Sequence, residues 1–197
     1  MFSRACRSSL AAFAMIIIMA VAVGAAEFQA DMTINSNEGG EIKGKVFVRD
    51  NSMRQEMETP LGDQVVIVNG DAGMMYILLP GQKMYVERPN TQVMLGDEEK
   101  IEEKLAEQGK ITKLGSENVE NYICEKIHIV YNDKNLGEST LWVAEKLNYP
   151  IKTYVQNPKD TATIIYSNIK EKRQKDTLFV VPAGYTKLEM DKKLLIE

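Results

Sequence analysis

The alternation of apolar and polar residues along this chain predicts a mainly β protein. In residues 53–58, Met53 and Met57 lie on one side of an extended chain, and the even positions, all charged, lie on the other. Residues 65–68 and 74–79 are apolar on both sides, as in strands that are covered on both faces. The predicted strands are 28–35, 44–49, 53–58, 65–68, 74–79, 122–131, 138–144, 151–156, 162–170 and 178–181.

Turn residues separate the strands of the first half at intervals of about nine to twelve residues. This spacing is typical of short antiparallel strands joined by hairpins. Asn69-Gly70 and Pro80-Gly81 suit tight turns, because Asn and Gly accept positive φ and Pro presets φ.

The pattern changes in residues 97–108, which are rich in helix formers. Asp97 can cap such a helix and Gly109 can end it. Its apolar side is narrow, with Ile101 and Leu105 and with Met94 just before the helix, so we expect a helix on a surface. The fold class predicted is mainly β (α+β): a single curved, half-closed antiparallel barrel of about ten strands, with this helix packed as a lid.

The first 26 residues have the pattern of a secretory signal peptide. Arg4 and Arg7 precede fourteen apolar residues, 10–23, and the small residues 24–26 form a cleavage site. The alternative, a membrane anchor, needs about 20 apolar residues. No cysteine stands immediately after the cut, so we expect a soluble protein rather than a lipoprotein, periplasmic in a Gram-negative cell. The domains predicted are residues 1–26, the signal, and 27–197, a single β domain.

Charge and cysteine content narrow the function further. The formal net charge is −4, and removing Arg4 and Arg7 with the signal makes it −6. An acidic chain without a basic stripe argues against nucleic acid as a partner.

Cys124 is the one cysteine after the signal, so no internal disulfide can form. Its simplest interpretation is a small buried residue, and a reactive thiol is the alternative.

No catalytic group or metal site is evident in the sequence. His128 is the single histidine, and it lies four residues from Cys124 on one predicted strand. At about 3.3 Å per residue, the two are roughly 13 Å apart, too far for a direct pair. No metal-ligand or phosphate-loop spacing is present. We expect no enzyme activity, no catalytic residue and no cofactor or metal.

Methionine is unusually frequent in the first half. Eight methionines follow the signal, and seven of them lie between Met32 and Met94. Methionine fills gaps in ordinary cores, but it also lines surfaces that adapt to variable partners. An open, curved sheet can hold an apolar ligand on such a surface. The candidate binding residues are Met53, Met57, Val66, Val68, Met75, Ile77, Met84, Met94, Ile101 and Leu105.

The order of these pieces resembles the outer-membrane lipoprotein carriers LolA and LolB, and most closely the related exported domains of unknown function. The segments that carry the resemblance are Phe28–Met32, Gly44–Val48, Met53–Glu56, Met75–Tyr85, Leu114–Cys124, Trp142–Pro150 and Asp176–Tyr185. The resemblance implies an apolar cavity between a half-closed barrel and a helical lid. It also implies that Arg54, or alternatively Arg49, ties the barrel to the lid.

The function expected is non-catalytic binding of an acyl chain, a lipid or a lipoprotein in the periplasm. The alternative is an envelope sensor or scaffold that binds a protein through the same concave surface. The expected partners are a lipid or lipidated protein, or envelope proteins, and the expected state is a monomer.

Overall fold

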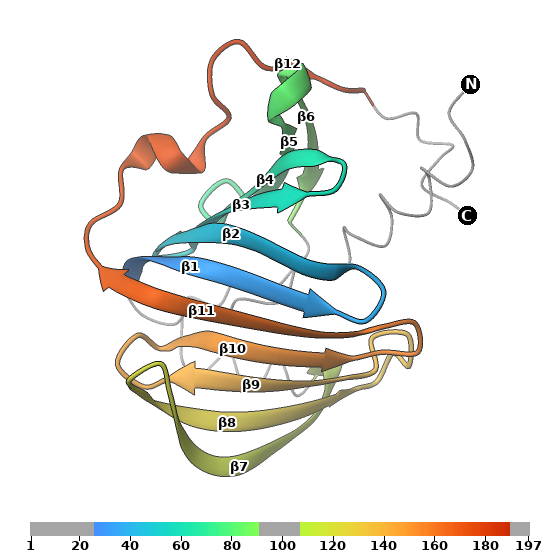
Figure 1. The fold of residues 1–197 in the computed structure, drawn as a ribbon, viewed down its shortest axis with the longest axis vertical. Helices are drawn as coiled ribbons and strands as arrows, with labels where there is room; N and C mark the ends of the chain where they lie inside the picture. The colour runs from blue at the N-terminus through green and yellow to red at the C-terminus, as the bar shows by residue number, and fades with distance from the viewer. Residues whose placement is uncertain (1–25, 91–106, 190–197) are drawn as a thin grey trace.

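The computed structural model describes residues 26–90 and 107–189. These residues form one twelve-stranded sheet in the order β12-β6-β5-β4-β3-β2-β1-β11-β10-β9-β8-β7 (Figure 1). The strands are β1 (Glu27–Ser36), β2 (Gly40–Arg49), β3 (Ser52–Thr59), β4 (Gly62–Asn69), β5 (Met74–Leu79), β6 (Met84–Pro89), β7 (Gly109–Val119), β8 (Tyr122–Tyr131), β9 (Glu138–Ala144), β10 (Tyr149–Gln156), β11 (Thr161–Glu171) and β12 (Thr186–Lys187). The 3₁₀ helices are η2 (Pro80–Gln82) and η3 (Asp176–Phe179).

The sheet consists of two antiparallel meanders, β1–β6 and β7–β11, joined side by side. Strand β1 makes the junction, because it pairs with β2 on one edge and with β11 on the other. Met32, for example, lies opposite Gly44 on β2 and Tyr166 on β11. The short β12 extends the other edge of the first meander by pairing in parallel with β6.

The sheet is strongly curved, and side chains fill the centre of its concave side. We call this side the inner face. Tyr149 on β10 stacks edge-on against Phe28, with ring centroids 5.2 Å apart, and its hydroxyl lies 3.3 Å from the sulfur of Met53 on β3. Gln55 Nε2 donates to the hydroxyl of Tyr166 at 3.2 Å. Because β3 and β10 are separated in the sheet by β2, β1 and β11, these contacts show that the sheet curls over its own core.

The opposite, outer face of the first meander is covered by residues 172–189, the C-terminal segment. Figure 1 shows this segment, in red, leaving β11 and running along the sheet to β12. Phe179 is buried in a cluster with Val65, Ile67 and Leu78. Strand β4 is therefore covered on both faces, which explains why 65–68 is apolar throughout, and the outer side of β5 is covered at Leu78.

The predicted half-closed barrel with a helical lid is wrong. The sheet is open, with edges at β12 and β7, and in the described ranges no helix covers its inner face. Buried side chains fill the centre of that face instead. The predicted helix 97–108 lies outside the described residues except for its last two positions. Strands β6, β7 and β12 were not predicted, and residues 178–181 form no strand, since Phe179 ends η3.

The predicted signal peptide also lies outside the described residues, apart from Ala26. In the part of the chain that the structure describes, no helix is long and apolar enough to cross a membrane.

Candidate functional site

The structure brings the described members of the predicted apolar site together on the inner face. Met53 lies opposite Val68, which in turn lies opposite Met75. In the next row Val66 lies opposite Ile77. Residues directly opposite each other in a sheet share a face. Period two places Met57 and Met84 on this face as well, Met84 being opposite Leu79.

Exposure divides these residues into two groups. Met53, Met57, Val66 and Val68 are fully buried, with exposed fractions between 2% and 6%. The residues at the free end of the face are only partly buried and form the β5–β6 strip: Met75, Ile77, Leu79, Met84 and Val86. Met94, Ile101 and Leu105 lie outside the described residues.

The β5–β6 strip is partly exposed because the sheet ends beside it. Strand β12 has only two residues and pairs only with Met84 and Tyr85. The rest of β6 up to Pro89 has no strand on its other side among the described residues. Met75 and Ile77 pack against the main core on their inner side, so the strip borders the filled centre of the face.

Arg88, which was not among the predicted site residues, lies at one end of the strip. It is opposite Met75, and alternation along β6 puts it on the same face as Met84 and Val86. Its Nε atom is buried and has no hydrogen-bond partner among the described residues. Period-two alternation over 84–88 is the signal in the sequence that would have placed Arg88 on this face.

Arg54 contacts the C-terminal segment. Its Nε donates to Glu56 at 2.7 Å, and Nη1 donates to the carbonyl oxygen of Leu178 at 3.2 Å. Arg49, the alternative, pairs with Asp176, and its guanidinium lies 4.9 Å from the ring centre of Phe179. Both arginines therefore attach the outer face to this segment.

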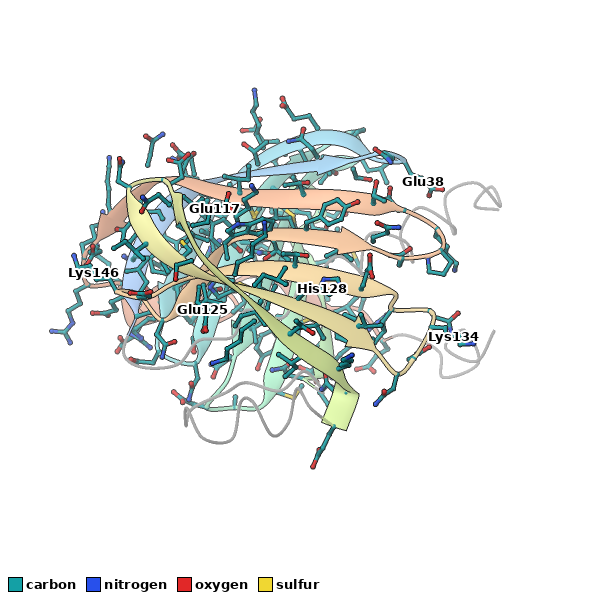
Figure 2. The ribbon with its side chains drawn as sticks, turned by 90° about the horizontal axis from the view of Figure 1, so that it is seen from below. Glu38, Glu117, Glu125, His128, Lys134 and Lys146 are labelled. Atoms are coloured by element: carbon teal, nitrogen blue, oxygen red, sulfur yellow. The ribbon has the colours of Figure 1, made fainter. Side chains whose placement is uncertain are left out.

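His128 and Cys124 occupy separate environments on β8. Nδ1 of His128 is 3.2 Å from the Thr140 hydroxyl, and Nε2 is 3.5 Å from Glu138. Figure 2 shows His128 between Lys146 and Lys134, which lie at opposite ends of this part of the sheet. Cys124 is fully buried, and this burial raises the pKa of its thiol, which disfavours the reactive thiolate. Over the described ranges, no group of three or more His, Cys, Asp or Glu side chains is placed to hold a metal ion.

A polar groove of about 560 Å³ lies at the β7–β8 turn, away from the strip. On one wall Glu171 accepts hydrogen bonds from Lys146 at 2.7 Å and from the Tyr122 hydroxyl at 3.0 Å. The bond from Lys146 is the main cause that lowers the pKa of the Glu171 carboxyl. These three side chains satisfy one another.

Comparison with known families matches residues 28–149 to the domain of unknown function DUF4412. The chain belongs to this family. The match begins at β1 and ends at the first residue of β10, so it includes the whole β5–β6 strip. A comparison with curated proteins finds no match for this DUF4412 chain.

Solved structures share the fold at low sequence identity. An uncharacterised conserved protein from Thermus thermophilus aligns over 84% of this DUF4412 chain and 91% of its own, with 12% identity and a TM-score of 0.59. MucB from Pseudomonas aeruginosa, in a complex with MucA, aligns with a TM-score of 0.53 and 15% identity. That alignment covers 80% of this chain but 56% of MucB.

A LolA superfamily protein from Nitrosomonas europaea also matches, with 12% identity over 88% of this chain and 97% of its own, and a TM-score of 0.39. The predicted resemblance to LolA-like domains, most closely to those of unknown function, is in line with the DUF4412 match and with the fold shared with the Thermus thermophilus protein and MucB. At such identities a likeness concerns the fold alone.

Proposed function

We propose that this DUF4412 protein binds an acyl chain of a lipid or lipidated protein, without catalysis, in the periplasm. The observation that carries the proposal is the β5–β6 strip. Strands β1–β6 all lie in the described residues. On their inner face, this strip is the one part where neighbouring apolar side chains are partly exposed and are not covered by a further layer of described residues. Residues 1–26 would direct export and be cleaved off, leaving 27–197 as a single domain.

The strip suits a flexible apolar ligand. Methionine is unbranched and polarizable, so Met75 and Met84 can adjust to chains of different shape. Each methylene group that leaves water contributes about 0.8 kcal/mol, so a shallow surface is enough for measurable binding. In this proposal the strip contacts the ligand, while Met53, Met57 and the valines of β4 form the floor beneath it. No cavity under a lid is needed.

A protein partner is the second candidate. The observation that favours it is β7, an eleven-residue strand at the edge of the sheet. Its outer backbone groups have no strand partner among the described residues, and Leu114 on it is 53% exposed. An edge of this kind can accept a further strand from another protein. MucB, which shares the fold, has been solved in a complex with MucA.

The two functions can be separated by lipid binding to the purified protein. We expect native mass spectrometry to detect bound lipid after incubation with an envelope lipid extract, and the melting temperature to rise. Met75→Asp and Met84→Asp place a carboxylate on the strip and should each weaken binding by at least about tenfold, because a charge cannot be buried under an acyl chain without a partner.

The matched control is Leu136→Asp, because Leu136 is an apolar residue that is 38% exposed in the turn between β8 and β9, in the other meander. This variant should bind lipid as the unmodified protein does. Protein that carries no lipid and does not respond to any added lipid, but retains a protein from envelope extracts, would overturn the lipid-binding proposal in favour of the second candidate.

A further inference from the structure

Arg88 is the one ionisable residue on the inner face of the first meander. Besides Arg88, the inner face of the described strands β1–β6 has only apolar residues, Gly, Ser, Thr and two glutamines, as the strand pairing shows. One of the two, Gln55, is already hydrogen-bonded to Tyr166. The arginine is thus a single positive charge at the end of an apolar strip.

The guanidinium of Arg88 is not fully satisfied by the described residues. Its Nε atom is buried and has no hydrogen-bond partner there. A buried polar group without a partner is costly, and in native structures such a group calls for an explanation, such as an ion or ligand. Arginine stays charged at any physiological pH, so a neutral form cannot relieve this cost.

Nearby carboxylates on β6 do not supply the missing partner. Glu87 is next to Arg88 in sequence but lies on the opposite face of the strand. There it pairs with Lys187 of β12. Among the described residues, the inner face thus keeps a positive charge without a paired carboxylate beside Met75, the residue opposite Arg88.

We propose that the ligand of the β5–β6 strip is a single-chain fatty acid, whose carboxylate binds the guanidinium of Arg88. This inference rests on the proposed function and adds the chemical class of the ligand. From Met84 to Arg88 the strip spans four residues, about 13 Å of extended strand, enough for the chain of one medium-length acid. The planar guanidinium can hold a carboxylate through two parallel hydrogen bonds, so charge and geometry match.

Isothermal titration calorimetry with three probes of equal chain length tests the proposal: decanoate, decanol and decyl phosphate. The unmodified protein should bind decanoate about 10- to 100-fold more tightly than decanol, the range expected for hydrogen bonds to a charged group. Arg88→Gln should remove this preference and leave decanol binding unchanged. Arg88→Lys, which keeps the charge but not the paired donors, should restore part of it.

Arg173→Gln is the matched control, because Arg173 is an exposed arginine on the C-terminal segment, and it should keep the full preference. Equal binding of decanol and decanoate by the unmodified protein would overturn the role of Arg88 and leave acyl-chain binding standing. Tighter binding of decyl phosphate than of decanoate, dependent on Arg88, would overturn the carboxylate assignment. Binding of none of the probes would overturn this proposal together with the proposed function.

Discussion

Two buried tyrosines show at the residue scale how the inner face is filled. Tyr149 and Tyr166 have exposed fractions of 1% and 6%, and their ring centroids are 6.2 Å apart. Burial raises the pKa of both hydroxyls, that of Tyr166 to about 12. Burial disfavours the phenolate in the folded protein more than in the unfolded chain, so these residues make the fold sensitive to alkaline pH.

We expect the free energy of unfolding to fall between about pH 10 and pH 12. The folded pKa of Tyr166, about 12, lies above the unfolded value of about 10, so the stabilisation is complete below pH 10 and is lost as the pH rises towards 12. A shift of this size corresponds to about 2–3 kcal/mol. Urea unfolding at a series of pH values measures it.

The variant Tyr166→Phe is the control for this pH effect. It loses the hydrogen bond to Gln55 and should be less stable at neutral pH by about 1 kcal/mol. Its stability should then decline less steeply than that of the unmodified protein above pH 10. Parallel declines in the two proteins would contradict this expectation, because they would mean that the pKa of Tyr166 is the same in the folded and unfolded states.

The C-terminal segment determines stability at the scale of elements. It covers the outer face through Phe179, which is 1% exposed, and through the contacts of Arg49 and Arg54 described above. Asn69 adds a hydrogen bond from its side-chain amide to the carbonyl oxygen of Phe179 at 3.3 Å. The segment contains only one short 3₁₀ helix and a two-residue strand, so side-chain contacts hold much of it in place.

Phe179→Ala should therefore destabilise the protein by about 3–4 kcal/mol, because it removes a fully buried ring and leaves a cavity. Val180→Ala is the matched control, since Val180 is 49% exposed, and it should cost less than about 0.5 kcal/mol. Chemical denaturation of the two variants measures the difference. Similar losses would show that the segment does not contribute through its apolar contact.

The elements that the sequence predicted well are those with strong local signals. The predicted bounds of β5, β8 and β9 agree with the structure, because these strands have continuous or alternating apolar residues between clear turns. Strand β7 was missed since it is an edge strand that is mostly exposed and contains Lys, Gly, Ser and Glu. Strand β6 is short and ends at Pro89, and its alternation was not recognised.

For the candidate site, the sequence could predict which residues share a face of the sheet wherever the strand itself was recognised. Period two correctly put Met53 and Met57 on one face, and the strand pairing adds Val66, Val68 and Met75. Arg88 was missed because β6 had not been recognised as a strand. The filling of the concave centre could not be predicted, since it depends on contacts between β3 and β10, which are almost a hundred residues apart (Tyr149 and Met53 are separated by 96 positions).

At the scale of the whole molecule, the open sheet has two unequal edges. The β12 edge is only two residues long. The β7 edge is longer, but its pairing with β8 shifts register between Lys113 and Ser116, where Gly115 has a φ of 95°. Irregularities and lysines of this kind protect edge strands from pairing with other copies. The β7 edge therefore discourages aggregation unless a partner fits its irregular shape.

The ladder between β1 and β11 has a practical consequence for work on this family. It joins the two meanders, yet the family match ends at residue 149 and omits β11 and nearly all of β10. A fragment cut at 28–149 would keep Phe28 and Met32 but lose Ile164, Tyr166 and the whole of β11, the strand that pairs with β1. We expect this fragment to be unfolded or aggregated by circular dichroism and size-exclusion chromatography, whereas 27–189 should fold. The unit that folds is thus longer than the region matched by the family. Recombinant DUF4412 domains should therefore extend through β11, the strand that pairs with β1.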